Sequence, residues 1–555
     1  MNLLPIFAAA AALPALAAAS SKLPIIETTG GRVLGAESPF RENVTVYKGI
    51  PFAAPPTGKN RWTPPKSATP WSDVLNATSF SPSCAQSSGS ASVLASGKSL
   101  TSEDCLYLNI WTPTYKTKAE IAEANLPVFL WIYGGRFVGG SGDVITYDGT
   151  GLASKDIIVV TINYRLGPFG YLAHPELSAV SGHNSSGNYG ILDQQFALRW
   201  VVDNIAQFGG NSSQITVGGQ SAGSASALDV MWSPLVNGLA QGVIAESGAR
   251  GPHDPVTGSA ATSYRTKCAA ERQGVRFLKT MNVTSIDELR NVSMEALLEY
   301  DSLDDTTFAN TQFENLTSGA FMEPPMWRPN IDGYVLRHTY GQALRLNAHA
   351  DIPILTGNNK DESGAETDPG LTLESFRTLY GGMFGDEFKD EFFKLYPASN
   401  TSEANQMSNE LFRDLSRVGT WNWAVDWKNG GAKSDVYSYY FDHYPAEDKS
   451  EGAYHGSELW YTFNNIPYAD YSSANWTQKD IEVEYHMSNY WANFIRTGNP
   501  NEGSEAGVNL PYFPPTVEEK KKCMWLGNSW GNGPLSATEA RIEFIKRWEA
   551  TLQEW

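Results

Sequence analysis

The sequence predicts an α/β fold in which a large, mostly parallel central β-sheet is flanked by helices. The predicted central strands are near-continuous apolar runs, which is typical of strands buried on both faces, and they lie at 126–133, 157–163, 242–248, 352–356 and 436–441. Helical segments separate many of these runs, and such alternation favours a parallel sheet. No linker rich in Pro, Gly or Ser divides the chain, so we expect one domain over residues 20–555.

The remaining segments complete this picture. Two short edge strands are expected at 31–35 and 44–50, and an alternating strand at 102–111. Apolar residues at helical spacing predict a helix over 193–208. A helical cap that covers the sheet is expected at 260–345. Further helical segments are expected in the C-terminal half, at 370–430, 484–496 and 537–551.

Composition and charge exclude several classes of partner. The formal net charge is −19, which disfavours binding to nucleic acid and to anionic membrane surfaces, because both are themselves negative. Residues 1–19 are apolar and end in alanines with an A-x-A pattern, which predicts a cleaved signal peptide. This stretch is too short for a membrane anchor, and no later segment is apolar for long enough to span a bilayer.

Sequons for N-linked glycosylation are dense along the chain. They begin at Asn43, Asn76, Asn184, Asn211, Asn282, Asn291, Asn315, Asn400 and Asn475. Together with the predicted signal peptide, this density predicts a secreted glycoprotein.

A short strand that turns sharply into a helix around one serine organises the chain. Residues 214–217 form a β-branched strand, residues 219–223 read G-x-S-x-G, and small, helix-compatible residues follow. This context predicts a nucleophile elbow with Ser221 at its tip, in which Gly219 and Gly223 avoid a Cβ clash. The helix N-terminus behind Ser221 favours negative charge that develops during a reaction.

Ester hydrolysis requires a base, an orienting acid and donors for the oxyanion, and each has a candidate after a predicted strand. His455, among small residues downstream of the strand 436–441, is the candidate base. Asp361 and Glu362 both follow the strand 352–356, and spacing alone does not choose between them. The candidate oxyanion donors are the N–H of Ala222 and the N–H groups of the Gly-rich segment 134–136.

Two motifs carry a family resemblance that covers essentially the whole mature chain. Residues 208–223, FGGNSSQITVGGQSAG, and residues 103–109, EDCLYLN, resemble the signatures of the type-B carboxylesterase/lipase family, which includes fungal lipases, liver carboxylesterases and cholinesterases. The resemblance implies the α/β-hydrolase fold, a serine esterase that needs no cofactor or metal, and a small-molecule ester substrate. Within this family the chain is most similar to secreted members of fungal type.

The resemblance assigns roles residue by residue. It implies that Ser221 is the nucleophile, His455 the base and Glu362, rather than Asp361, the acid. The implied oxyanion-hole and supporting residues are Gly135, Arg136, Ala222, Ser247 and Gln220. Cys84 and Cys105, natural partners in an oxidising compartment, resemble the first disulfide of the family, whereas Cys268 and Cys523 either pair or stay separate. The implied buried ion pairs are Arg61–Glu103 and Arg165–Asp193.

Three departures from the family pattern bear on specificity. Arg136 stands where the family has glycine or alanine, so a long cation lies beside the oxyanion hole, where it binds a carboxylate or narrows the acyl pocket. Gln220 replaces the usual glutamate of the elbow, which weakens the attraction for a cationic substrate. The loop 84–105 contains no aromatic residue, whereas cholinesterases place a cation-binding tryptophan there.

The leading hypothesis is a secreted carboxylic ester hydrolase that acts through an acyl-enzyme on small to medium, non-choline esters. One alternative is a lipase or sterol esterase, although the loop 84–105 is short and lacks the apolar face of a lipase lid. The other, from a different class, is a non-catalytic binding or adhesion protein. The chain keeps all three residues of the predicted triad, which argues against this second alternative.

Overall fold

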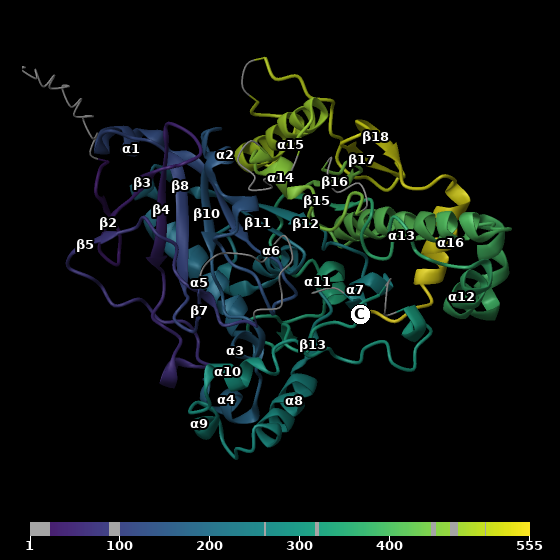
Figure 1. The fold of residues 1–555 in the computed structure, drawn as a ribbon, viewed down its shortest axis with the longest axis horizontal. Helices are drawn as coiled ribbons and strands as arrows, with labels where there is room; N and C mark the ends of the chain where they lie inside the picture. The colour runs from purple at the N-terminus through teal and green to yellow at the C-terminus, as the bar shows by residue number, and fades with distance from the viewer. Residues whose placement is uncertain are drawn as a thin grey trace, which may run out of the picture.

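A computed structural model describes residues 23–87, 100–259, 262–316, 321–445, 451–466, 475–504 and 507–555. The predicted signal peptide, residues 1–19, and most of the loop between Cys84 and Cys105 lie outside these ranges. In Figure 1 the N-terminal strands lie at one end of the molecule and helices α12, α13 and α16 lie at the other.

An eleven-stranded mixed sheet runs through the described chain. Its order is β18-β17-β16-β15-β12-β11-β9-β10-β8-β4-β3. The seven central strands from β17 to β10 pair in parallel, as expected for the five that are apolar runs, whereas β17 was not predicted. The parallel strands are β9 (Leu126–Ile132), β10 (Ile158–Ile162), β11 (Gly210–Gln220), β12 (Gly242–Glu246), β15 (Ile354–Asn359), β16 (Val436–Phe441) and β17 (Lys522–Leu526).

Antiparallel strands close both edges of this sheet. They are β3 (Ala36–Glu37), β4 (Val44–Pro51) and β8 (Tyr107–Pro113) at one edge and β18 (Gly531–Pro534) at the other. Smaller sheets are formed by β1 (Ile26–Glu27), β2 (Arg32–Leu34) and β5 (Val74–Asn76), by β6 (Ser83–Cys84) and β7 (Thr101–Ser102), and by β13 (Arg265–Thr266) and β14 (Asn330–Ile331).

Helices occupy the connections between the strands and most of the C-terminal half. Those of the N-terminal half are α1 (Lys118–Ala124), α2 (Thr150–Ala153), α3 (Gly167–Tyr171), α4 (Pro175–Val180), α5 (Tyr189–Asn204), α6 (Ala222–Trp232), α7 (Pro255–Ser259) and α8 (Lys267–Thr280). The others are α9 (Ile286–Leu289), α10 (Met294–Leu298), α11 (Tyr340–Arg345), α12 (Leu373–Leu395), α13 (Thr401–Asn429), α14 (Leu459–Thr462), α15 (Gln478–Thr497) and α16 (Glu539–Glu549). Short 3-10 turns lie at Gly58–Asn60, Ile145–Tyr147, Ile205–Phe208, Pro234–Val236 and Glu314–Leu316.

Local chemistry explains where the long helices begin. The Asn400 side chain accepts the N–H of Glu403 and starts α13, and a reciprocal capping box between Thr477 and Asp480 starts α15. Helix α12 is kinked at Gly385, whose φ of 62° no helix can contain. The predicted helical segments at 370–430, 484–496 and 537–551 are therefore present, with α15 beginning earlier than expected.

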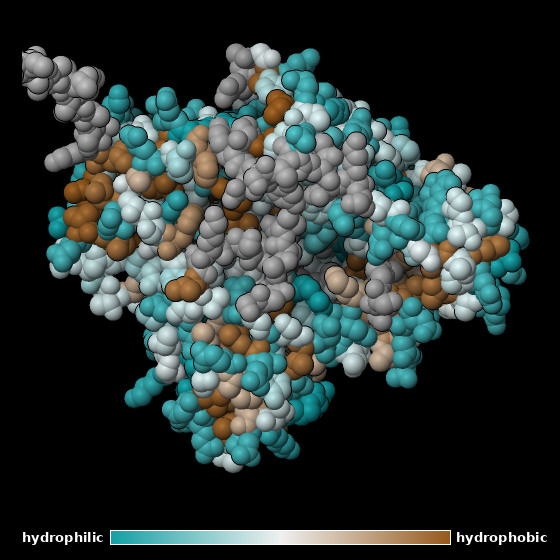
Figure 2. Space-filling model, in the orientation of Figure 1, coloured by the Kyte–Doolittle hydropathy of each residue, from teal (hydrophilic) through white to brown (hydrophobic). Residues whose placement is uncertain are grey.

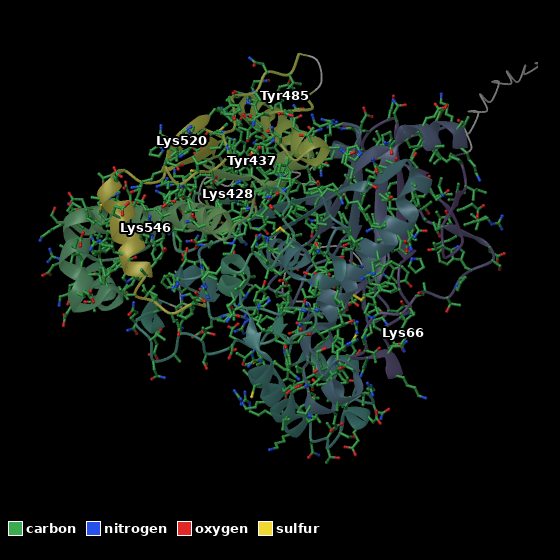
Figure 3. All side chains as sticks on the ribbon, turned by 180° about the vertical axis from the view of Figure 1, so that it is seen from behind. Lys66, Lys428, Tyr437, Tyr485, Lys520 and Lys546 are labelled. Atoms are coloured by element: carbon green, nitrogen blue, oxygen red, sulfur yellow. A yellow bond between two sulfur atoms is a disulfide. The ribbon has the colours of Figure 1, made fainter. Side chains whose placement is uncertain are left out.

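Two apolar clusters form the core. The larger one surrounds the central sheet, and the smaller one consists mainly of aromatic side chains between α12, α13 and α16. Hydrophilic side chains cover most of the described surface on the face drawn in Figure 2. From behind, Figure 3 shows Lys546 of α16 toward the end of the molecule remote from Lys66, and Lys428 of α13, which packs against α16, nearer the middle.

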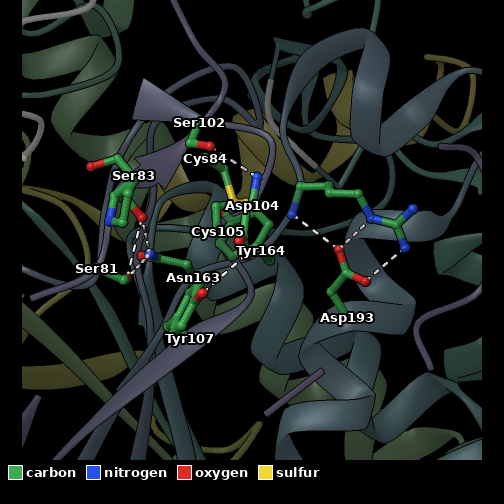
Figure 4. The surroundings of a disulfide bond; sticks show 12 residues. Ser81, Ser83, Cys84, Ser102, Asp104, Cys105, Tyr107, Asn163, Tyr164 and Asp193 are labelled. Atoms are coloured by element: carbon green, nitrogen blue, oxygen red, sulfur yellow. Dashed lines mark hydrogen bonds and ion pairs between the residues drawn. A yellow bond between two sulfur atoms is a disulfide. The ribbon is translucent and has the colours of Figure 1, made fainter. Parts of the chain in front are cut away.

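The expected strand over 102–111 is interrupted. Residues 103–106 separate β7 from β8, because the Glu103 carboxylate is held by Arg61 at 2.5 Å and Cys105 is held by its disulfide to Cys84. Figure 4 shows this disulfide and Asp193 nearby. The Asp193 carboxylate bonds the Arg165 guanidinium at 2.7 Å. Cys268 is exposed and Cys523 is buried, and the structure leaves these two thiols separate.

Candidate active site

Ser221 lies at the turn between β11 and α6. Its backbone has φ 59° and ψ −123°, a conformation that is costly for any residue except glycine and that marks functional turns. The Ser221 N–H donates to the carbonyl of Glu246 at 2.9 Å, which holds the turn at the carboxyl end of the sheet. The predicted strand–turn–helix is therefore present, with Ser221 at its tip.

The glycines of the elbow are required by close backbone contacts. A Cβ on Gly219 would lie 2.2 Å from the carbonyl oxygen of Gly223, and a Cβ on Gly223 would lie 2.0 Å from that of Ile132. Both separations are far below van der Waals contact. Any larger residue at either position would push α6 away from β9 and β11 and would displace Ser221.

His455 and Glu362 form a close pair. The Nδ1 atom of His455 lies 2.6 Å from Oε2 of Glu362, and the second carboxylate oxygen accepts the N–H of Asn359 at 2.8 Å. The Glu362 side chain is 1% exposed, whereas that of His455 is 43% exposed. The carboxylate is thus fixed and buried, and the imidazole reaches from it into the cavity that it lines together with Ser221.

The neighbouring carboxylate, that of Asp361, bonds other partners. Asp361 bonds the Arg413 guanidinium at 2.5 Å and accepts the N–H of Ala453 at 2.9 Å. The spacing of the sequence left Asp361 and Glu362 as alternatives, and in the structure only Glu362 of the two contacts His455.

The far side of the imidazole meets Gln220 rather than Ser221. Nε2 of His455 lies 3.1 Å from Nε2 of Gln220, and we find no hydrogen bond of the Ser221 hydroxyl within the described chain. A neutral His455 carries its proton on Nδ1, facing Glu362, so its Nε2 lone pair accepts from the Gln220 amide. The expected contact between serine and imidazole is therefore replaced in this state by one from the adjacent glutamine.

Opposing effects set the pKa of His455. Loss of solvent around the enclosed part of the ring favours its neutral form, but the hydrogen bond and charge of Glu362, with the charge of Glu458, outweigh this and raise the pKa of His455 above its ordinary value. The imidazolium is therefore stabilised where a proton would be transferred from Ser221.

The Gly-rich loop after β9 lies against the elbow. A Cβ on Gly134 would lie 3.0 Å from Cβ of Ser221, so the two turns are in contact. Gly135, Arg136 and Phe137 all have positive φ, at 104°, 56° and 62°. Within the described chain, the N–H groups of Gly135 and Arg136 make no hydrogen bond, and that of Ala222 begins α6, where N–H groups have no partner within the helix.

The disulfide segment supports this loop. The Gln86 side chain, two residues after Cys84, donates to the carbonyl of Gly140 at 2.9 Å and accepts the N–H of the same residue at 2.9 Å. Gln86 also donates to the carbonyl of Cys84, so the disulfide and the loop are connected through one amide.

The Arg136 side chain is turned toward Asp304 and Glu323. Its Nη2 bonds Oδ1 of Asp304 at 2.8 Å and the carbonyl of Glu323 at 2.6 Å. Arg136 nevertheless lines the cavity, of about 190 Å³, that contains Ser221 and His455. Ser247 also lines this cavity, and its buried hydroxyl has no hydrogen-bond partner within the described residues.

Sequence reasoning missed two buried carboxyl groups behind the histidine. Burial, followed by the charge of Glu362, raises the pKa of Glu458 to about 7, and burial with the nearby Glu458 raises that of Glu246 well above its ordinary range. Trp491 donates to Glu246 at 2.7 Å. The available signals were a glutamate at the end of an apolar strand and another three residues after His455.

The described residues form neither a metal-binding cluster nor a membrane-spanning helix. Among the described residues, no group of three or more His, Cys, Asp or Glu side chains is arranged to hold a metal ion. Of the helices that the structure describes, none has both the length and the apolar character of a bilayer-spanning segment.

Known proteins resemble this chain in sequence and in fold. Residues 22–542 match the model of the Carboxylesterase family. The fumonisin B1 esterase of Sphingopyxis macrogoltabida is 32% identical, over 94% of this chain and 90% of that protein, and the para-nitrobenzyl esterase of Bacillus subtilis is 33% identical, over 89% and 94%. A solved PNB esterase structure is similar with a TM-score of 0.73 and 30% identity, covering 94% of this chain and 99% of the other.

Proposed function

Because the chain belongs to the carboxylesterase family, and is therefore a carboxylic ester hydrolase, we propose that Ser221, His455 and Glu362 form its catalytic triad. The observation that carries this assignment is the bond of His455 Nδ1 to the buried Glu362, at 2.6 Å, at the cavity that Ser221 also lines. This bond selects the tautomer whose Nε2 can accept a proton.

The reaction proceeds in two halves. His455 Nε2 takes the hydroxyl proton as Ser221 Oγ forms a bond to the ester carbonyl carbon, and the same proton then passes to the alcohol as its C–O bond breaks. Water, deprotonated by His455, attacks the acyl carbon of the acyl-enzyme. The bond to Ser221 Oγ then breaks, the carboxylic acid leaves, and His455 returns the proton to Oγ. Glu362 keeps the imidazole oriented and stabilises its charged form throughout.

The oxyanion of each tetrahedral intermediate is bound by backbone N–H groups of Gly135, Arg136 and Ala222. Support comes from the contact of Gly134 with Ser221 and from the N–H groups of Gly135 and Arg136, which have no hydrogen-bond partner among the described residues. Each such donor contributes about a hundredfold or more to the rate. Gln220 and Ser247 act as supporting residues around the triad.

Small to medium non-choline esters are the proposed substrates. The neutral Gln220 supplies no charge for a quaternary ammonium group, and the loop from Cys84 to Cys105 carries no aromatic residue for a cation–π contact. The same loop is short for a lipase lid. Hydrolysis of emulsified long-chain esters faster than soluble short ones would favour the lipase alternative instead.

We also propose that the protein is secreted, with cleavage of residues 1–19, and is N-glycosylated. Of the nine sequon asparagines, eight are exposed and Asn211 is partly buried, so glycans can be accommodated. Expression in a eukaryotic secretory host should give a protein whose N-terminus begins after residue 19 and whose mass falls on treatment with an N-glycosidase.

Replacement of the nucleophile tests the function. Ser221→Ala should reduce the hydrolysis of 4-nitrophenyl butyrate by about a thousandfold or more, with the melting temperature unchanged within a few degrees. Ser224→Ala is the matched control, because this buried hydroxyl lies one turn further along and makes no hydrogen bond within the described chain. Retained turnover in Ser221→Ala would refute the assignment.

A further inference from the structure

The cavity at Ser221 differs in charge from the molecule around it. The chain has 60 acidic and 41 Lys and Arg residues, yet the described residues that line this cavity include the two arginines Arg136 and Arg250 and no Asp or Glu. A cationic lining at the bottom of a cleft concentrates its field in the low-dielectric interior. Such a lining attracts an anionic group of a substrate and repels a cationic one.

Arg136 has donors left for a ligand. Both of its hydrogen bonds, to Asp304 and to the Glu323 carbonyl, use Nη2, and the N–H groups of Nε and Nη1 have no partner within the described chain. The Arg136 side chain is 37% exposed and that of Asp304 is 53% exposed, so solvent screens this ion pair. The arginine is thus anchored at one nitrogen while the rest of its guanidinium remains accessible.

Arg250 adds a second positive charge at the cavity. Its side chain is 3% exposed, its Nε bonds Asp254 at 2.7 Å, and its Nη1 and Nη2 are buried without a hydrogen-bond partner in the described chain. Asp254 offsets much of the Arg250 charge. We therefore assign the direct contact with a ligand to Arg136 and a longer-range contribution to Arg250.

We propose, resting on the ester hydrolase function above, that the site prefers esters whose acyl or alcohol part carries a free carboxylate, which the Arg136 guanidinium binds. Guanidinium groups form the strongest side-chain hydrogen bonds to carboxylates, and a residue of the oxyanion loop lies beside the reacting carbonyl. Gln220 at the elbow is uncharged, so it does not repel the carboxylate of such a substrate.

Pairs of substrates that differ only in charge test the proposal. For the acyl part, 4-nitrophenyl hydrogen adipate is compared with the corresponding 4-nitrophenyl adipamate. For the alcohol part, 4-acetoxybenzoate is compared with 4-acetoxybenzamide. The measured quantity is the ratio of kcat/KM for the carboxylate to kcat/KM for the carboxamide, and the pair with the larger ratio identifies the part of the substrate that Arg136 contacts.

Two variants assign the preference to Arg136. In the wild type we expect a ratio of about ten in one pair, equivalent to about 1.4 kcal/mol. Arg136→Gln should bring this ratio to about one, whatever its effect on the absolute rates. Asp304→Asn, which removes the competing carboxylate but keeps the hydrogen-bond acceptor, should raise the ratio and leave the carboxamide rate unchanged.

Each outcome decides one of the two proposals. Ratios of one or below in both wild-type pairs would overturn the anionic preference while leaving the esterase function intact. A ratio above one that neither variant changes would overturn the role of Arg136. Absence of hydrolysis of all four substrates would overturn the esterase function itself, and the anionic preference with it.

Discussion

The side-chain nitrogen of Gln220 lies 3.1 Å from Nε2 of His455, the atom that we propose accepts the proton of Ser221. Since Nδ1 of the same ring is bound to Glu362 at 2.6 Å, both edges of the imidazole are held and its plane is fixed. In the mechanism proposed above, the Ser221 hydroxyl displaces the Gln220 amide from Nε2 before it is deprotonated. On this proposal the glutamine orients the base and competes with the nucleophile for it.

Gln220→Glu should raise the pKa of His455, because a carboxylate beside Nε2 stabilises the imidazolium and removes the donor that stabilised the neutral ring. The base must be neutral to act, so the acidic limb of the pH profile of kcat/KM should move to higher pH by about one unit. Gln220→Met, of similar size but without charge, is the control and should shift it less. A limb that stays in place or moves down would contradict the geometry.

Glu362→Gln should have the opposite effect on that limb. The pKa of His455 is raised chiefly by the hydrogen bond and charge of Glu362 acting against burial, so removal of the charge lowers it and moves the limb to lower pH. The plateau of kcat should fall about a thousandfold to ten-thousandfold, since the imidazole loses its orientation. Asp361→Asn is the control, because that carboxylate bonds Arg413. Equal effects in both variants would argue against Glu362.

The parts of the fold that the sequence predicts well are those in which local chemistry and burial agree. The runs at 126–133 and 157–163 are apolar because β9 and β10 are covered on both faces. Gly219 and Gly223 are recognisable because a Cβ at these positions would lie 2.2 and 2.0 Å from backbone carbonyl oxygens, which excludes any side chain. The family comparison then confirms the hydrolase fold that these features predict.

What the sequence does not predict depends on contacts between distant segments. β18 has the composition of a turn and becomes a strand only by pairing with β17. The bond of Gln220 to His455 joins residues 235 positions apart. Glu362 rather than Asp361 contacts His455, because Arg413 and Ala453 hold the aspartate elsewhere.

Glu484 should make stability depend on pH. Burial, against the charges of Arg41 and Lys155, raises the pKa of this carboxyl to about 7, although its Oε1 accepts the N–H of Ile466 at 2.8 Å. The folded protein therefore holds a proton between about pH 4.5 and 7 that the unfolded chain releases, so this contribution to stability is lost as pH rises through that window.

Glu484→Gln keeps the acceptor and does not ionise. Its free energy of unfolding should exceed that of the wild type by about 1–3 kcal/mol at pH 8 and by little at pH 4.5. Glu482→Gln, on the exposed face of the same helix, should show no such difference. Denaturant unfolding at both pH values measures these free energies of unfolding. A gain for Glu484→Gln that is larger at pH 4.5 than at pH 8 would contradict the raised pKa of Glu484.

The disulfide should stabilise both the fold and the oxyanion loop. Cys84 and Cys105 are 21 positions apart, so the variant with serine at both should lose about 3 kcal/mol of unfolding free energy. Because Gln86 connects Cys84 to Gly140, kcat should fall as well. Cys268→Ser, at an exposed free thiol, is the matched control. Unfolding by denaturant, with esterase assays in parallel, tests both effects, and equal stability of the two variants would contradict this account.

The most direct test of the central claim is the site at which a fluorophosphonate reacts with the folded protein. We predict one adduct per chain, found by mass spectrometry on the peptide that contains Ser221, with loss of esterase activity in proportion to labelling. Labelling should be far slower in His455→Ala, because the hydroxyl then lacks its base. An adduct on a different residue, or a folded and active protein that does not react, would contradict the proposed nucleophile.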